Sequence, residues 1–314
     1  MSFSLKNSHI IVNYHYVRNV NKNDKGINSC SIKEFERQIG FLSSSYKIVS
    51  IPEVFNSVQE NTKGRFCAVT FDDCLKDVYV NAFPVLKKNK CMATIFPIAS
   101  VFEGKMPYVH KMHMLISVFG VRSLIKFFNN FIEKLPEYKN KYRIPLNKRL
   151  FKKIRLDDDI PTANFKEVVS VIPDGLRNSF IDTVFNKTNI KENDALKDFF
   201  ASKKEIISML NNSFEIGSHS YEHKNLRTMS QVNLKDDIDK SLNILSSLFV
   251  SKNKIKTFSY PHGRFNKNIL EVLSKTNIEY AVTIEEKNIT KKTNRFSVPR
   301  YDTNNIRDYL DLQK

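Results

Sequence analysis

The chain has 314 residues, of which 41% are hydrophobic and 26% are charged, and its formal net charge is +17 at pH 7. This composition is that of a soluble globular protein with room for one large domain or two small ones. No stretch approaches 18 uninterrupted apolar residues, which argues against a membrane-spanning helix.

The amino-terminal segment and the cysteines both indicate a cytoplasmic protein. The segment MSFSLKNSHIIVNYHYV lacks the basic start, the long apolar core and the small-residue cleavage site of a secretory signal. The cysteines, Cys30, Cys67, Cys74 and Cys91, form no CxxC pattern. We therefore expect reduced thiols and a cytoplasmic location.

The positive charge is compatible with three kinds of partner: a nucleic acid, an anionic membrane surface or an anionic substrate. The lysines are spread along the whole chain among many asparagines and isoleucines, and neither a basic tail nor an RNA-binding aromatic motif is present. This distribution argues against nucleic acid. Peripheral association with an anionic membrane and attraction to an anionic lipid- or nucleotide-linked glycan both stay open.

The first third of the chain alternates apolar runs with amphipathic stretches. Strands are predicted at 10–14, 47–50, 68–71 and 93–98, and helices at 32–42, 52–58 and 78–88. We expect Ser31 to cap the first of these helices with Glu34 as its capping-box partner, and Pro52 suits the first turn of the second. The strand–helix–strand unit over 68–98 is typical of a parallel sheet.

Residues 105–204 interrupt this rhythm, being rich in Lys, Asn and Phe and mostly helical in pattern, as over 112–128, with a loop around 173–175. We interpret them as a helical insertion into a single domain that spans residues 1–314. Beyond them, strands are predicted at 214–217, 257–260, 280–283 and 296–298. Helices are predicted at 202–211 and 266–275, and another carries Leu234 and Phe249 on one face. Each strand ends in a polar cluster, which favours a barrel-like parallel arrangement with the chemistry at the strands' carboxyl ends.

Two adjacent carboxylates, Asp72 and Asp73, follow the buried run AVTF at 68–71. Adjacent carboxylates repel, so a site that keeps both ionised usually holds a cation or another positive partner. The alternative is that they cap the following helix, whose first turn favours Asp. The carboxylates alone leave both interpretations open.

A second polar cluster, SHSYEH, follows the strand predicted at 214–217 and contains His219 and His223. On a helical turn, residues four apart lie on one face, so both imidazoles can bind one metal ion. A lone histidine is more often structural, whereas two at ligand spacing favour a site. Together with one carboxylate from Asp72 or Asp73 they form a His₂Asp set with open positions, which is typical of a catalytic rather than a structural zinc.

The order and context of these motifs resemble the polysaccharide deacetylase family (NodB-homology domain, carbohydrate esterase family 4). TFDD at 70–73 and HSYEH at 219–223 match the first two motifs of that family, and FSYPHG at 258–263 resembles its third. The early YH at 14–15 and the late VPR at 298–300 resemble its branch of glycan deacetylases. The resemblance covers nearly the whole chain outside 105–204.

The resemblance implies a distorted (β/α) barrel with fewer than eight strands and a metal-dependent hydrolase. It assigns Asp73, His219 and His223 as metal ligands and Asp72 as the catalytic base. Zn²⁺ suits this set, and Ni²⁺, Co²⁺ or Fe²⁺ accept the same ligands. The implied reaction removes an N-acetyl or other N-acyl group from an amino sugar of a bacterial-type polysaccharide or of a lipid- or nucleotide-linked precursor.

The sequence departs from the family pattern at three places. The third motif usually carries an Arg that orients the base, but here the matching positions are Ser259, Pro261 and His262. Arg300 is our candidate replacement, because a fixed cation can pair with Asp72; the alternative is a surface arginine. The chain has no Trp for the fourth motif, and no His follows His262 to serve as the general acid of the fifth.

We therefore expect His15 to protonate the leaving amine, because it should lie at a strand's carboxyl end. His262 is the second candidate, or else supplies a backbone N–H to the oxyanion hole. His110 and His113 have site-like spacing, but a helix-surface position is expected for them. The missing Arg, Trp and His also support an alternative function, a catalytically weak or inactive glycan-binding protein that retains the deacetylase fold.

Overall fold

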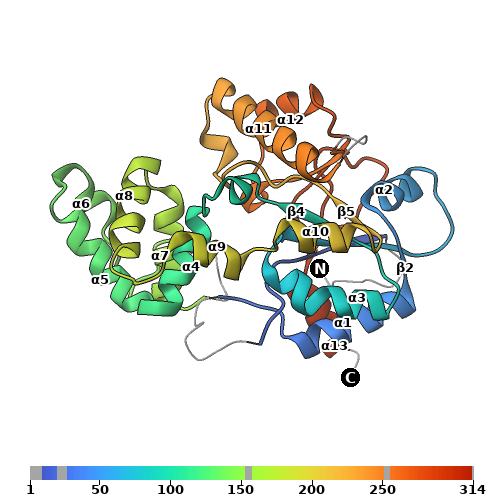
Figure 1. The fold of residues 1–314 in the computed structure, drawn as a ribbon, viewed down its shortest axis with the longest axis horizontal. Coiled ribbons are helices and arrows are strands. Elements are labelled where there is room, and N and C mark those ends of the chain that lie inside the picture. Colours follow the sequence, from blue (N-terminus) through green and yellow to red (C-terminus); the bar gives the residue numbers. More distant parts are fainter. Residues whose placement is uncertain (1–8, 20–26, 153–157, 251–254, 313–314) are drawn as a thin grey trace. The chain divides into compact units, whose positions relative to one another are not determined.

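The computed structural model describes residues 9–19, 27–152, 158–250 and 255–312. The chain divides into two compact units (Figure 1). The first, which we name the barrel unit, consists of Met1–Asn19, Ser29–Lys105 and Leu196–Lys314. The second, the helical unit, consists of Val20–Asn28 and Met106–Ala195. Whether the helical unit is an insertion into one catalytic domain stays a prediction.

The barrel unit is built on parallel strands. The main sheet has the order β5-β4-β3-β1-β8, and β2 pairs with β3; β6 and β7 pair separately. The bounds are β1 (Ile10–Tyr14), β2 (Lys47–Ile48), β3 (Phe66–Asp73), β4 (Ala93–Pro97), β5 (Phe214–Ile216), β6 (Thr257–Ser259), β7 (Tyr280–Val282) and β8 (Tyr301–Asp302).

Two isolated bridges continue this arrangement around a ring. Ser218, just past β5, bridges to Phe258 in β6, and Val282 in β7 bridges to Val298. Val298 leads within three residues into β8, which pairs with β1. The strand ends therefore converge, which is the barrel-like parallel arrangement expected from the alternation of strands and helices. The strand predicted at 296–298 is wrong, because only Val298 makes a bridge and the ladder forms at Tyr301–Asp302.

Helices cover the outside of the barrel unit, with α11 and α12 on one side of the strands in Figure 1 and α1, α3 and α13 on the other. The bounds are α1 (Ile32–Ser45), α2 (Ile51–Gln59), α3 (Phe83–Lys88), α10 (Lys203–Leu210), α11 (Gln231–Phe249), α12 (Lys267–Ser274) and α13 (Thr303–Asp311). A π-helical turn (Val78–Ala82) precedes α3, and short 3₁₀ turns cover Ala99–Glu103, Leu226–Thr228 and Pro261–Gly263.

The helix starts follow from their capping residues. Ser31 accepts the backbone N–H of Glu34 at 3.2 Å, which confirms it as the N-cap of α1. The Glu34 carboxylate instead accepts hydrogen bonds from Arg37 and Gln38. Ser50 forms a full capping box with Glu53 at the start of α2. Buried apolar side chains from the strands and the inner faces of these helices form the core beneath the site.

The helical unit contains α4 (Tyr108–Phe119), α5 (Val121–Ile132), α6 (Pro136–Tyr142), α7 (Ile160–Val171) and α8 (Asp174–Phe185), and α9 (Glu192–Phe199) begins in it. The helical pattern predicted over 112–128 is confirmed except at Gly120, where the chain bends by 114° between α4 and α5. Gly120, with φ 73°, makes this break in a conformation that L side chains rarely adopt. The loop predicted around 173–175 is shorter than expected, because Pro173 is already the N-cap of α8 and Asp174 begins the helix.

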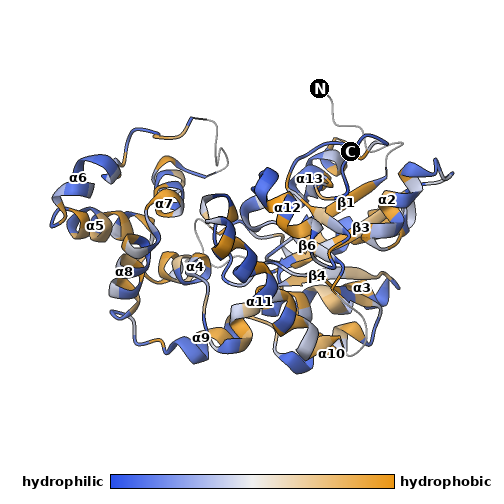
Figure 2. Ribbon diagram, turned by 90° about the horizontal axis from the view of Figure 1, so that it is seen from above, coloured by the Kyte–Doolittle hydropathy of each residue, from blue (hydrophilic) through white to orange (hydrophobic). Residues whose placement is uncertain are grey.

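Hydropathy along the ribbon, shown in Figure 2, agrees with these packing faces, and hydrophobic residues line the inner sides of α5 and α8. Phe128 of α5 and Phe180 of α8 meet edge to face, with ring centroids 5.0 Å apart. Within the described ranges, no single helix has both the length and the apolar composition to cross a membrane. The bent pair α4–α5 meets those two criteria only when its helices are taken together.

Candidate active site

The two carboxylates that end β3 point to different partners. Asp72 and Asp73 pair with Phe96 and Pro97 of β4 in the parallel ladder, and both are buried. Asp73 and Cys74 then have φ of 65° and 55°, so the chain turns sharply at this point. The next helical turn starts only at Val78 and has Asp77 at its N-cap position, so neither carboxylate caps it.

Asp73, His219 and His223 lie together and are buried. The Oδ1 atom of Asp73 is 3.6 Å from Nε2 of His219 and 3.5 Å from Nε2 of His223. Two ligands bound to one zinc ion at ordinary distances and a tetrahedral angle are about 3.4 Å apart. The three side chains therefore have the chemistry and the spacing of a His₂Asp metal site.

The histidine loop reaches this position without a helical turn, contrary to the expectation from the spacing. Residues 219–223 form an irregular loop in which Ser220 and His223 have φ of 66° and 56°. The Ser220 hydroxyl accepts the backbone N–H of His223 at 3.1 Å. The loop thus brings both imidazoles to Asp73 through two left-handed residues, which spacing alone does not predict.

Gly217 allows this loop to start where it does. A Cβ atom at this position would lie 2.3 Å from the Phe96 ring and 2.5 Å from the Thr257 hydroxyl, closer than real Cβ contacts. The backbone between β5 and His219 therefore passes against β4 and β6 at a distance that only glycine permits.

The orientation of His219 also fits a metal ion. Its Nδ1 lies 2.7 Å from the backbone carbonyl oxygen of Ser259. A carbonyl can only accept, so Nδ1 carries the proton and the Nε2 lone pair points toward Asp73 and His223. Burial lowers the pKa of His219, against the pull of the Asp72 and Asp73 carboxylates. A neutral imidazole with a fixed tautomer is the form that binds a divalent ion.

Asp72 faces the other way, toward Arg300. Nη1 of Arg300 donates to Oδ1 at 2.9 Å and Nη2 donates to Oδ2 at 2.7 Å, a bidentate pair in which Arg300 is 1% exposed. The arginine is therefore not on the surface. Burial opposes ionisation of Asp72, but the charge of Arg300 outweighs it and holds the pKa of the carboxyl well below its usual range.

Two further histidines lie at the rim of this arrangement. Nε2 of His15, which follows β1, is 3.7 Å from Oδ2 of Asp72, and its side chain is 39% exposed. The ring of His262 packs edge to face on that of His223, with centroids 4.6 Å apart. The structure thus brings all seven predicted site residues, Asp72, Asp73, His15, His219, His223, His262 and Arg300, to one place in the barrel unit.

The family is decided by comparison with known proteins. The model of the polysaccharide deacetylase family matches residues 59–115 and 158–281. The chain belongs to the polysaccharide deacetylase family. This confirms the resemblance inferred from the TFDD and HSYEH motifs.

Similar proteins agree with this assignment. A poly-beta-1,6-N-acetyl-D-glucosamine N-deacetylase of Staphylococcus aureus (strain MRSA252) is 24% identical over 311 residues, which covers 94% of this chain and 78% of that protein. The Streptococcus pyogenes deacetylase PplD in complex with acetate superposes with a TM-score of 0.61 at 15% identity, covering 96% of this chain and 97% of that one. IcaB from Ammonifex degensii gives a TM-score of 0.57 at 17% identity, covering 94% and 91%. At these identities the two structures establish the fold alone, and they confirm the predicted barrel class.

Asn13, a buried polar residue in the otherwise apolar strand β1, is a site residue that was not predicted from the sequence. Its Nδ2 donates to Oδ2 of Asp72 at 3.2 Å, and its Oδ1 accepts from Arg300 at 2.8 Å. Thr70 and Ser259 accept further hydrogen bonds from Arg300, at 3.1 and 3.0 Å. The signal was present, since Asn13 is the single polar residue in IIVNY, and a polar residue buried in a strand needs a partner.

Asp237, a buried carboxylate of α11, was likewise not predicted from the sequence. Its Oδ1 accepts the backbone N–H of Tyr221 at 3.0 Å, in the middle of the histidine loop. Burial raises the pKa of Asp237 to about 6, against backbone hydrogen bonds from Tyr221 and Glu222. This carboxylate ties α11 to the segment between the two predicted histidine ligands.

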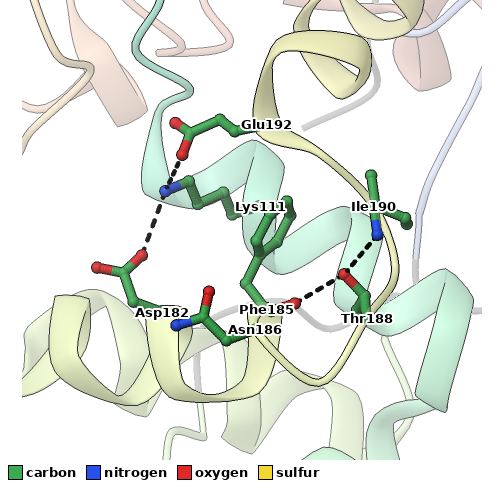
Figure 3. Close-up of a pocket in the computed structure, with 7 residues that line it drawn as sticks. All are labelled: Lys111, Asp182, Phe185, Asn186, Thr188, Ile190 and Glu192. Carbon is green, nitrogen blue, oxygen red and sulfur yellow. Dashed lines mark hydrogen bonds and ion pairs between the residues drawn. The ribbon is translucent and has the colours of Figure 1, made fainter.

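The helical unit holds a separate cavity of about 480 Å³ that contains none of the predicted site residues (Figure 3). Lys111 lies across it, 3.2 Å from Asp182 and 3.0 Å from Glu192. Its charged groups thus compensate one another, and we interpret the cluster as structural. His110 is fully buried in the same unit, so the surface position expected for it is wrong.

Proposed function

We propose that this family member is a metal-dependent hydrolase that removes the N-acetyl group, or another small N-acyl group, from an amino-sugar glycan. The proposal rests on one observation: the adjacent residues Asp72 and Asp73 have different kinds of partner. Asp72 pairs with Arg300, whereas Asp73 lies against two imidazoles at metal-ligand spacing. A base next to a metal-ligand set is an arrangement that supports metal-assisted hydrolysis of an amide.

Asp73, His219 and His223 would hold the ion, and Zn²⁺, Ni²⁺, Co²⁺ and Fe²⁺ all suit this set. When bound there, a divalent ion supplies a Lewis acid for the amide carbonyl and lowers the pKa of water. The remaining steps fall to side chains of this chain.

Asp72 would accept the proton of the attacking water as the water oxygen bonds to the amide carbon. Arg300 would keep this carboxylate ionised and fix the position of both of its oxygens. Asn13 would donate a further hydrogen bond to Oδ2. His15 would donate a proton to the amine as the C–N bond breaks, leaving acetate and a free amino sugar. His262 is the second candidate for this donation, or its backbone N–H would stabilise the oxyanion.

The named activity of the Staphylococcus aureus relative makes β-1,6-linked N-acetylglucosamine the first substrate to test, and a lipid- or nucleotide-linked precursor the second. The domain organisation is part of the proposal: one catalytic domain over residues 1–314, with residues 105–204 as a helical insertion. The cytoplasmic location expected from the sequence stays a prediction.

The test is the release of acetate from N-acetylated β-1,6-glucosamine oligosaccharides by the purified chain, before and after removal of bound metal with a chelator. We expect turnover that chelation abolishes and that Zn²⁺ or Co²⁺ restores. If the protein binds one equivalent of metal and binds the oligosaccharide, yet releases no acyl group from any N-acylated amino sugar, the inactive glycan-binding alternative is correct.

A further inference from the structure

A short segment of the helical unit concentrates positive charge far beyond the average of the chain. Residues 139–152, which we name the cationic loop, run from α6 into the loop that precedes α7. They contain six basic residues and no acidic one: Lys139, Lys141, Arg143, Lys148, Arg149 and Lys152. The lysines of the chain as a whole are spread out, so this cluster is a local feature that the overall charge conceals.

Leucines with exposed side chains lie between these cations. Leu146 is 39% exposed and Leu150 is 41% exposed, while Lys141, Lys148 and Lys152 are exposed around them. Figure 2 shows hydrophilic and hydrophobic residues alternating along the segment that follows α6. The cationic loop therefore presents apolar and positively charged side chains to solvent together.

Two side-chain amides, one of them fully buried, hold the loop in this conformation. Asn164 of α7, which is fully buried, accepts the N–H of Leu150 at 2.9 Å and donates to the carbonyls of Pro145 and Lys148 at 3.0 and 2.8 Å. Asn129 of α5 makes a reciprocal pair with the backbone of Ile144. Because the interior satisfies the backbone groups of the loop, the exposure of its leucines belongs to a defined structure and not to a frayed end.

Within the described ranges, acidic side chains offset part of this charge. Glu133 contacts Lys139 and Arg143 from α5. The nearest buried acid, Asp158, is paired with Lys166 at 2.9 Å, and its backbone carbonyl accepts a hydrogen bond from Arg149. The exposed lysines of the loop thus face solvent and are available to an anionic partner.

We propose that the cationic loop docks the protein on an anionic lipid membrane. Clusters of four to eight basic residues bind acidic phospholipids, and each contributes about 1 kcal/mol near the surface. A nucleic acid would use the same charges but gains nothing from exposed aliphatic side chains, whereas Leu146 and Leu150 can enter the boundary between headgroups and acyl chains. This inference does not rest on the proposed hydrolase activity, because it concerns other residues and another measurement.

The experiment is co-sedimentation of the full chain with vesicles of phosphatidylcholine alone and of phosphatidylcholine with 30% phosphatidylglycerol, at low and at high salt. We expect binding only to the anionic vesicles, weakened at high salt. The triple variant K141Q/K148Q/K152Q should bind about a hundredfold more weakly. The variant L146S/L150S should lose about three- to tenfold while keeping the salt dependence.

The matched control is K63Q/K88Q/K90Q, which removes three exposed lysines from the barrel unit, and circular dichroism should show all variants folded. Binding of this control equal to that of the wild type supports the proposal. Equal losses in both triple variants would mean that net charge alone drives binding and would overturn it. Tight binding of single-stranded RNA that L146S/L150S leaves unchanged, without binding to the anionic vesicles, would overturn it in favour of a nucleic-acid surface.

Discussion

The proposed base half of the site, Asp72 with its partners, and the proposed ligand half, Asp73 with His219 and His223, differ in the source of the charge that compensates each carboxylate. In the base half, Asp72 accepts hydrogen bonds from Nη1 and Nη2 of Arg300 and from the side-chain amide of Asn13. The chain itself therefore supplies the compensating charge. In the ligand half, Asp73 faces two imidazoles whose charge depends on protonation. Neighbouring carboxylates on one strand can thus be both ionised, one beside a built-in cation and the other prepared for a bound one.

The largest effect should come from breaking the ligand half. In His219→Ala, the removal of one of three proposed ligands should reduce bound metal from about one equivalent to near zero and acetate release to background. Metal content is measured by atomic emission on the purified protein. A variant that keeps both metal and turnover would contradict the assignment of His219.

Breaking the base half should separate the two properties. Asp72→Asn keeps the shape of the side chain but cannot accept the water proton, so turnover should fall by roughly 10²- to 10⁴-fold. Bound metal should stay near the wild-type level, since Asp73 and the histidines are unchanged. Loss of metal in this variant would show that Asp72 belongs to the ligand half instead.

The exposed rim of the base half is tested by His15→Gln. If His15 protonates the leaving amine, turnover should fall about a hundredfold, with metal content unchanged. His262→Gln is the matched control. An unchanged rate in His15→Gln with a large loss in His262→Gln would transfer the acid role to His262.

A smaller effect is expected when the ion pair between Arg300 and Asp72 is weakened. In Arg300→Lys the bidentate contact is lost, so the pKa of Asp72 should rise toward its ordinary range. A base works only when deprotonated, so the acidic limb of the kcat/KM profile should move to higher pH. At neutral pH Asp72 stays ionised, and the about tenfold loss expected there comes from the lost bidentate contact that fixes the carboxylate. A uniform loss at all pH values would instead point to a general disturbance of folding, which the thermal midpoint would reveal.

The last effect is on stability and not on turnover, and it concerns the support of the proposed ligand half by Asp237. Because burial raises the pKa of Asp237 to about 6, the folded state binds its proton more tightly than the unfolded chain does. Its contribution to the free energy of unfolding is therefore present below about pH 4 and is lost as the pH rises through about 6. Relative to Asp237→Asn, the wild type should lose on the order of 2–3 kcal/mol between pH 4 and pH 7. Urea unfolding measures this change, and Asp239→Asn, at a more exposed position on the same helix, should show none.

The elements of the barrel unit were largely predictable because their signals are local. β1 was predicted with its observed bounds, and α2 and α10 were predicted to begin at 52 and 202, one residue from their observed starts. The structure departs from the predicted pattern where a backbone conformation overrides it. Gly120 divides an apolar helical stretch into two helices, and the histidine loop uses left-handed residues at Ser220 and His223 in place of a helical turn.

The sequence by itself determined which side chains are available at the strand ends, because carboxylates and imidazoles that follow buried strands can be recognised from apolar runs and spacing. Only the tertiary structure decided their partners. Arg300 meets Asp72 across 228 residues, and Asn13 forms hydrogen bonds with both. The physical reason is that closure of the ring of strands, through Val298 and β8 onto β1, brings distant strand ends together. No local pattern encodes which polar group will then lie opposite a given carboxylate.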